Sequence, residues 1–193
     1  MSGRSRSRLL LSLALVALVV LVGLLRHAAG PQSAEPSRAA IAAAFAGSPP
    51  ALAALHSRGG RLLSGGLRGF DAQLLALRGQ PVVVALWASW CAACRRELPT
   101  LQRVSVADGR RVAFLGVDVR DPPPAGADLL RSFPVSYPSW LDPSGKISRS
   151  LTSADAYPQT VFIDRHGSVV DDHLGTWATA AALQRAVVAH LLG

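Results

Sequence analysis

The chain has 193 residues, half of them apolar, which is enough for one domain with a hydrophobic core and an additional segment. The formal net charge is +8, and four of the twenty basic residues but none of the acidic ones lie before Gly30. The remaining charge is spread out, with no basic stripe and interleaved aromatic residues, so the composition argues against a nucleic-acid-binding protein.

A long hydrophobic run marks the N-terminal part. Three arginines precede an uncharged run over residues 9–25, which as a helix would span about 26 Å of a hydrocarbon core about 30 Å thick. Arg26 and His27 follow without a clean signal-cleavage site, and no cysteine directly follows that would anchor a lipid. We therefore expect residues 1–30 to be an uncleaved membrane anchor, with secretion after signal cleavage as the alternative. The positive-inside rule then places the rest of the chain outside the cytoplasm.

A linker is predicted next. Residues 31–37 are rich in Pro, Ser and Ala and indicate a tether. Residues 39–56 predict one or two short helices, interrupted by the Gly-Ser-Pro-Pro sequence at 47–50. We assign residues 31–59 to this linker with its short helices and residues 60–193 to one folded domain.

Strand and helix patterns alternate through the domain. The β-branched run over 81–87 is typical of a buried central strand, and apolar residues recur at helical spacing from residue 94 to residue 104. Pro99 is expected to kink that helix, and the prolines of 121–124 predict a loop. The other predicted elements are a strand near 61–64, a helix near 70–77, a strand over 112–117, a helix near 127–133, strands over 160–163 and 168–172 joined by a turn, and a helix over 178–192.

Both cysteines lie in the sequence Trp-Cys-Ala-Ala-Cys at residues 90–94. A purely structural disulfide across so short a loop would contribute only about 2 kcal/mol. A structural zinc site needs further Cys or His ligands at suitable spacing, and the five histidines are scattered. A c-type haem site needs His at position 95, which is Arg. The pair is therefore predicted to be redox-active.

The predicted elements place Cys91 at or near the start of a helix. There the helix dipole and the free backbone N–H groups stabilise a thiolate, which is the attacking species in disulfide exchange. We therefore expect Cys91 to be the nucleophile. Cys94, one helical turn further along, is expected to be the resolving thiol.

The segment 77–101 resembles the active-site segment of the TlpA/ResA-like branch of the thioredoxin superfamily. The resemblance continues through 111–118 and 157–167 and covers about residues 60–193. It implies an α/β, thioredoxin-like fold, in which a central mixed β-sheet is flanked by helices. Residues 132–156 would form the insertion that distinguishes TlpA/ResA-like proteins.

The resemblance also implies residues that bind the substrate. Pro158 would be the cis-proline that faces the two cysteines, and Tyr157 would offer backbone groups to an extended substrate segment. From the sequence alone, Pro158 would be an ordinary turn residue. Trp90 is a candidate for a partly exposed contact beside Cys91. Gln159 departs from the Thr or Ser that is common in the family, and its effect on substrate choice is left open.

Glu97 is the candidate proton carrier. Thioredoxin has a buried Asp where this chain has Ala85, whereas ResA-like members associate a Glu at the position of Glu97 with the active site. The alternative is a solvated helix residue that pairs with Arg95 or Arg96.

The resemblance implies a membrane-tethered, extracytoplasmic thiol–disulfide oxidoreductase. It would reduce protein disulfides, with cytochrome c apoproteins as one substrate class, and would exchange electrons with an unidentified membrane donor or acceptor. No cofactor is expected beyond the disulfide of Cys91 and Cys94, and no metal. The dipeptide Ala92-Ala93 does not decide the direction of electron flow, so a DsbA-type oxidase or isomerase is an alternative.

Two further classes were weighed. A copper chaperone on this fold uses Cys-x-x-x-Cys with a distant His, for which His173 would be the candidate, but the cysteine spacing here is one residue short. A thiol peroxidase needs Thr or Ser three residues before the reactive cysteine, where this chain has Ala88. That class is excluded.

Overall fold

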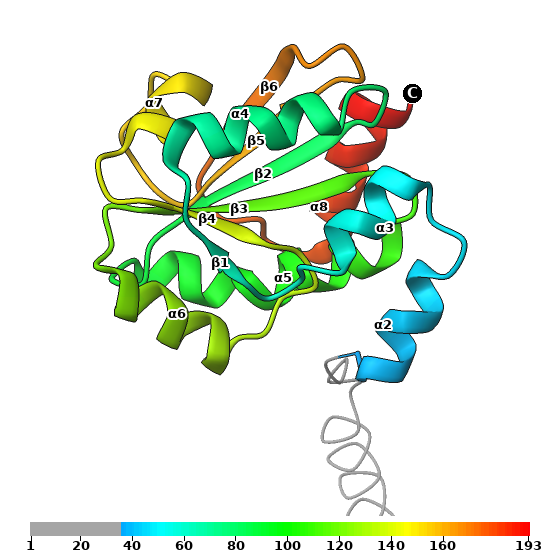
Figure 1. The fold of residues 1–193 in the computed structure, drawn as a ribbon, viewed down its shortest axis with the longest axis horizontal. Coiled ribbons are helices and arrows are strands. Elements are labelled where there is room, and N and C mark those ends of the chain that lie inside the picture. Colours follow the sequence, from blue (N-terminus) through cyan, green and yellow to red (C-terminus); the bar gives the residue numbers. More distant parts are fainter. Residues whose placement is uncertain (1–35) are drawn as a thin grey trace, which may run out of the picture. The chain divides into compact units, whose positions relative to one another are not determined.

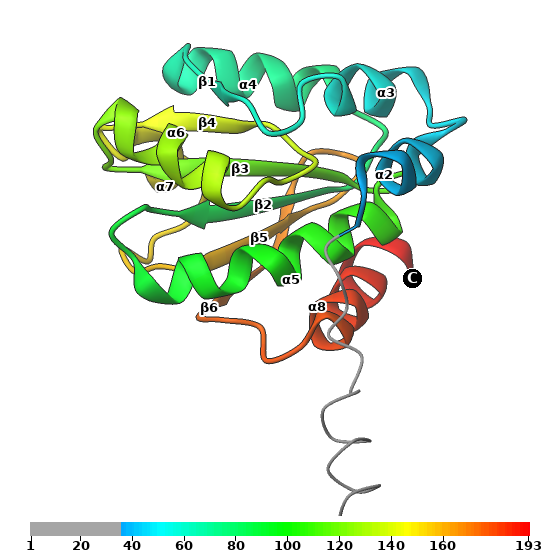
Figure 2. The same ribbon diagram turned by 90° about the horizontal axis from the view of Figure 1, so that it is seen from below.

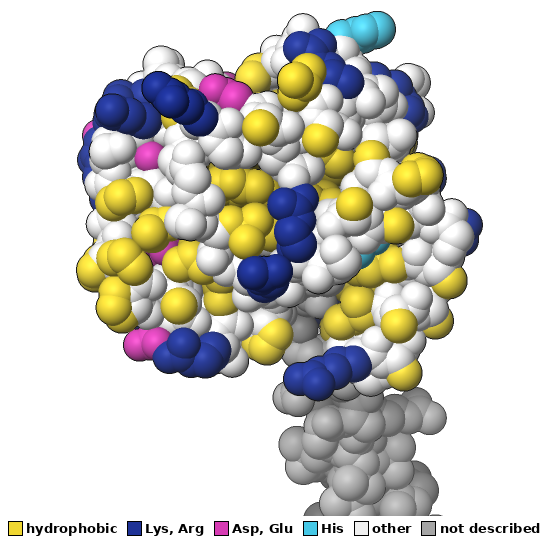
Figure 3. All heavy atoms as spheres, in the orientation of Figure 1, with side chains coloured by type: hydrophobic (Ala, Val, Ile, Leu, Met, Phe, Trp, Pro, Cys, Tyr) yellow, Lys and Arg dark blue, Asp and Glu magenta, His cyan; other side chains and the backbone are white. Residues whose placement is uncertain are grey.

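The computed structural model describes residues 36–193. The predicted membrane anchor over 9–25 lies outside the described residues. Within them, none of the helices combines the length and apolar character that a membrane crossing requires. Basic side chains are dispersed over the face shown in Figure 3 and do not form one stripe.

Six strands form one mixed sheet in the order β1-β4-β3-β2-β5-β6. The pairs β1–β4, β4–β3 and β3–β2 are parallel, and β2–β5 and β5–β6 are antiparallel. The predicted mixed sheet is thereby confirmed. The strands are β1 (Leu62–Leu63), β2 (Val82–Trp87), β3 (Ala113–Val119), β4 (Ser139–Asp142), β5 (Gln159–Ile163) and β6 (Val169–Leu174).

Helices cover both faces of the sheet (Figures 1 and 2). Helices α3, α4 and α7 pack on one face, and α5, α6 and α8 pack on the other. The helices are α2 (Arg38–Phe45), α3 (Pro50–His56), α4 (Gly66–Ala76), α5 (Ala92–Asp108), α6 (Pro123–Ser132), α7 (Lys146–Leu151) and α8 (Ala180–Val187), which continues into the π-helical turn η1 (Val188–Leu192).

The central strand β2 shows why two cores form. All six of its residues are buried, and alternate side chains point to opposite faces. Val83 and Trp87 enter the core beneath α5, whereas Val84 and Leu86 enter the core beneath α4. The apolar run thus supplies both cores, as expected for a strand covered on both faces.

Helix α6 corrects one prediction. Residues 121–124 were expected to form only a loop, but α6 begins at Pro123, with Pro122 as its N-cap residue. Proline is well suited to the first turn of a helix because the N–H groups there have no intrahelical acceptor. The prolines therefore start the helix.

The other predicted elements form with shifted ends, whereas β4 and α7 lie within residues 132–156, where the sequence predicts an insertion without an assigned strand or helix. Helix α4 begins at Gly66, four residues before the predicted start, and Pro99 lies inside α5. The two predicted short helices before residue 59 form as α2 and α3. Leu52 and Leu55 of α3 are fully buried in the same core as Phe70, so α3 contributes to the domain interior. The domain boundary at residue 60 stays a prediction.

Candidate active site

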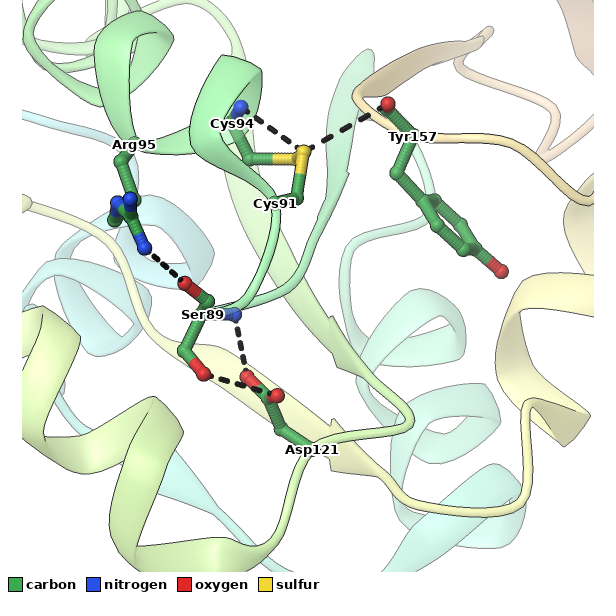
Figure 4. Close-up of a disulfide and its surroundings, with 6 residues drawn as sticks. All are labelled: Ser89, Cys91, Cys94, Arg95, Asp121 and Tyr157. Carbon is green, nitrogen blue, oxygen red and sulfur yellow. Dashed lines mark hydrogen bonds between the residues drawn. A yellow bond between two sulfur atoms is a disulfide. The ribbon is translucent and has the colours of Figure 1, made fainter.

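Cys91 occupies the N-cap position of α5. Strand β2 ends at Trp87, and a short loop leads to Cys91, whose backbone is still extended (φ −80°, ψ 103°). The Cys94 N–H donates to Cys91 Sγ at 3.0 Å, so the sulfur takes the place of a capping oxygen. Figure 4 shows this arrangement. The position gives the sulfur a hydrogen-bond donor and the positive end of the helix dipole.

The two cysteines form a disulfide, with their Cα atoms 5.2 Å apart. They differ in exposure: Cys91 is 8% exposed and Cys94 is 1% exposed. Both cysteines are thus largely buried, and the remaining exposure favours attack at Cys91 over attack at Cys94.

The segment around Pro158 faces the disulfide from the start of β5. The Tyr157–Pro158 peptide bond is cis, as the resemblance implied. The carbonyl oxygen of Tyr157 lies 3.7 Å from Cys91 Sγ (Figure 4). The Pro158 carbonyl accepts a hydrogen bond from Gly175 N–H at 2.9 Å, which ties this segment to the end of β6.

Trp90 and Tyr157 flank the reactive sulfur. Trp90 is 57% exposed, and the centroid of its ring lies 6.2 Å from that of Tyr157 in an edge-to-face arrangement. An exposed tryptophan beside a cysteine is a ready apolar contact for a docking chain.

The side chain of Gln159 links two segments of the fold. Its side chain is buried, and Nε2 donates to Thr152 Oγ1 at 2.8 Å and to Asp172 Oδ2 at 2.5 Å. The residue therefore ties the segment after α7 to β6 and contributes no exposed surface for a substrate.

Glu97 is buried, and this excludes one of its two interpretations. It is only 4% exposed, and its Oε1 accepts a hydrogen bond from Trp177 N–H at 2.8 Å. Arg95 donates instead to the carbonyl of Ser89, so the interpretation as a solvated residue paired with an arginine is wrong. Burial raises the pKa of Glu97 to about 7, against the opposing effect of the Trp177 hydrogen bond. The carboxyl can thus take up and release a proton near neutral pH.

Sequence reasoning missed two acidic residues beside the active-site loop. Asp121 Oδ2 accepts from Ser89 N–H at 2.5 Å, and Oδ1 accepts from Ser89 Oγ at 3.0 Å (Figure 4). Asp118, near the end of β3, is fully buried. The signal that would have found it is a carboxylate between the valines 117 and 119 of an otherwise apolar run.

His173, the candidate copper ligand, packs against an aromatic side chain. Its ring stacks on that of Trp177, with 3.9 Å between centroids. Among residues 36–193, no three His, Cys, Asp or Glu side chains converge in a way that would hold a metal ion.

Two relatives are named for disulfide exchange. Over 100 residues the chain is 33% identical to the thiol:disulfide interchange protein DsbE of Pseudomonas fluorescens biotype C, covering 51% of this chain and 54% of that protein. Over 111 residues it is 26% identical to the thiol-disulfide oxidoreductase ResA of Geobacillus kaustophilus, covering 57% of this chain and 63% of that protein. The chain thus spans between half and two thirds of the length of these curated relatives.

A solved structure and a family model agree with these relatives. DsbF of Mycobacterium tuberculosis, in mixed oxidised and reduced forms, aligns with a TM-score of 0.55 and 30% identity, covering 59% of this chain and 83% of that chain. The resemblance to ResA-like proteins and the thioredoxin-like α/β fold are confirmed. The model of the AhpC/TSA family matches residues 66–171, more than half of the chain. The chain therefore belongs to the AhpC/TSA family.

Proposed function

We propose that this protein is a thiol–disulfide oxidoreductase of DsbE/ResA type that exchanges disulfides through Cys91 and Cys94. The observation that carries the proposal is a disulfide whose first cysteine, 8% exposed, caps helix α5 and whose second cysteine, 1% exposed, lies one turn further along. The names of the relatives support the same activity. The family also suggests peroxidase chemistry, but the buried Ala88 stands where a thiol peroxidase needs a hydroxyl group.

In the reducing direction, the Cys91 thiolate attacks one sulfur of a client disulfide. The client S–S bond breaks, the leaving sulfur takes a proton, and a mixed disulfide with Cys91 forms. Cys94, as a thiolate, then attacks Cys91 Sγ and releases the second client thiolate, which is protonated. Two electrons have passed to the client, and the protein holds the Cys91–Cys94 disulfide.

Glu97 serves the second step. It lies three residues after Cys94 on α5, which places both side chains on neighbouring positions of one helix face. Because its pKa is raised to about 7, its carboxylate can accept the Cys94 proton before the attack on the mixed disulfide.

Trp90, Tyr157 and Pro158 form the client-binding edge. The exposed Trp90 ring offers an apolar contact, and the Tyr157 backbone lies beside Cys91 Sγ. An extended client segment can pair with this backbone while its disulfide reaches Cys91.

We further propose that the protein works as a reductant outside the cytoplasm, tethered to the membrane through residues 9–25, and that cytochrome c apoproteins are among its clients. The hydrophobic run, the flanking arginines and the resemblance to ResA support this placement. A membrane protein would supply its electrons.

The roles of the cysteines are tested by insulin reduction with dithiothreitol as electron source. We expect Cys91→Ser to abolish catalysis. Cys94→Ser should accumulate mixed disulfides with client proteins, because the resolving thiol is missing. Activity retained by Cys91→Ser, or no trapped complex with Cys94→Ser, contradicts the assignment.

The direction is tested by the reduction potential of the cysteine pair against glutathione. A value near −270 mV supports a reductant, and a value near about −120 mV supports a DsbA-type oxidant. The location is tested by fractionating cells and probing the folded domain with a protease from the outside. Recovery in the cytosol contradicts the tether.

A further inference from the structure

The loop that carries Cys91 is fastened at Ser89. The Ser89 N–H and Oγ both donate to Asp121, and the Ser89 carbonyl accepts from Arg95 Nη1 at 2.9 Å (Figure 4). All the hydrogen-bonding groups of this residue are therefore engaged. Cys91 N–H donates to the Ala88 carbonyl at 3.2 Å, which closes a four-residue turn with Ser89 and Trp90 at its centre.

The sheet topology brings Asp121 to this loop. Strands β2 and β3 are parallel neighbours, so their carboxyl ends reach the same edge of the sheet. Arg120 has a φ of 56°, in the left-handed region that a non-glycine residue rarely adopts, and it turns the chain directly after β3. Asp121 follows and is buried. A carboxylate with both oxygens accepting from one residue is a well-defined clamp.

Asp118 lies behind this clamp. It is the register partner of Trp87 at the end of β2, and Gly126 of α6 leaves room for it, since a Cβ at that position would overlap Asp118 Oδ2. Burial, followed by the proximity and the charge of Asp121, raises the pKa of Asp118 to about 9. At neutral pH Asp118 is therefore protonated, and its carboxyl oxygens have no partner at hydrogen-bond distance among residues 36–193.

We propose that Asp121 is a positioning residue of the dithiol: its carboxylate accepts two hydrogen bonds from Ser89 and so keeps Cys91 at the N-cap of α5. This inference rests on the proposed function in taking Cys91 as the reacting thiol. It goes further in assigning a residue outside the Cys-x-x-Cys motif to the reactivity of that thiol.

The test is the rate of alkylation of Cys91 by iodoacetamide, from pH 5 to pH 10, in the full-length chain with Cys94→Ser. In Asp121→Asn we expect the midpoint of the thiol profile to move about one pH unit higher, because the sulfur leaves the Cys94 N–H. An unchanged midpoint overturns the proposal. A lower midpoint also overturns it, because removal of a nearby negative charge lowers a thiol pKa, and the carboxylate would then act only through its charge.

Asp118→Asn separates the hydrogen bonds of Asp121 from a general effect of a buried carboxyl near the loop. Asp118 makes no hydrogen bond to Ser89, so the thiol midpoint should stay unchanged in this variant. A rise equal to that in Asp121→Asn overturns the proposal.

Asp108→Asn is the matched control. Asp108 is equally buried, lies at the opposite end of α5 and accepts from Arg111 and Gln184. It should leave the thiol midpoint unchanged, and an equal shift in this variant would show a merely structural effect.

Ser89→Ala covers the case in which Asp121→Asn does not fold. It removes only the Oγ–H donor and should move the midpoint in the same direction by less. An unchanged midpoint in Ser89→Ala counts against the clamp. Iodoacetamide needs no protein client, so a failed insulin assay and a failed positioning test are distinguishable.

Discussion

The two faces of the sheet differ in how they treat buried polar groups. On the face covered by α4 and α7, most buried polar groups find partners: Ser148 N–H donates to Asp142 Oδ2, and Arg58 binds Gln73, whereas Gln159 Oε1 has none. On the face covered by α5 and α6, more such groups lack a hydrogen-bonded partner by distance among residues 36–193, namely both carboxyl oxygens of Asp118, the hydroxyls of Tyr137 and Ser139, and Trp87 Nε1.

One face of the sheet therefore contributes more to stability, and the other carries more of the groups that take part in the chemistry. An unpartnered buried polar group costs free energy, so a face that carries several of them is stabilised less by the same apolar area. Raised carboxyl pKa values arise on that face, beneath the dithiol. The opposite face supplies the apolar packing that allows these groups to stay buried.

The largest expected effect is on the apolar face. Phe70→Ala should lower the free energy of unfolding by about 3–5 kcal/mol, because Phe70 is fully buried in the core beneath α4. Urea unfolding measures the change, with the exposed Leu75→Ala on the same helix as a control that should stay within about 0.5 kcal/mol. A change in Cys91 alkylation per folded molecule would show that the faces are not separate.

Glu97→Gln should change how stability depends on pH. Because the folded pKa of about 7 lies above the unfolded value of 4.5, the native state holds a proton that the unfolded state has released, and stability falls as pH rises through this window. The variant cannot titrate, so from pH 4 to pH 8 it should gain up to about 3 kcal/mol relative to the parent. Denaturant unfolding at several pH values measures this, and parallel curves would contradict a buried, titrating Glu97.

Gly126→Ala should be destabilising by about 1–3 kcal/mol, because the added methyl group overlaps the Asp118 carboxyl. Asp118→Ala in the same chain should relieve the overlap, so the two substitutions should be less than additive. Thermal unfolding of the single and double variants measures the coupling. Full additivity would mean that α6 does not press on Asp118.

The smallest effect on stability is expected for Trp90→Ala, within about 0.5 kcal/mol, because the side chain is mostly exposed. Its kcat/KM for insulin should nevertheless fall severalfold, while alkylation of Cys91 by iodoacetamide is unchanged. Val188→Ala is the control, because Val188 is also an exposed apolar residue and lies far from Trp90 in the sequence. Equal losses in the two variants would argue against a client contact at Trp90.

Elements with regular apolar patterns could be predicted from the sequence, whereas the buried polar residues and their contacts could not. The strand at 81–87 and the helix after Cys91 could be predicted because a β-branched run and a helical apolar spacing leave few alternatives. The strand predicted over 112–117 ended too early, because a carboxylate usually leaves the core, whereas β3 continues through Asp118 to Val119.

Long-range contacts were out of reach of the sequence. Glu97 had two open interpretations, and its burial depends on Trp177, which lies 80 residues later. Asp121 was placed in a proline-rich loop, and its hydrogen bonds to Ser89 join residues 32 positions apart. Local patterns carry no information on such pairs, which are set by how the strands align in the sheet.

The unequal burial of the two sulfurs has a consequence for oxidative damage. A peroxide that reaches the reduced protein meets Cys91 first and converts its thiolate to a sulfenic acid. The Cys94 thiol, with its Cα only 5.2 Å from that of Cys91 in the disulfide, then attacks this sulfur, expels water and forms the disulfide. The lesion is returned to the ordinary oxidised form before irreversible oxidation to sulfinic acid, so Cys94 also protects the less buried Cys91.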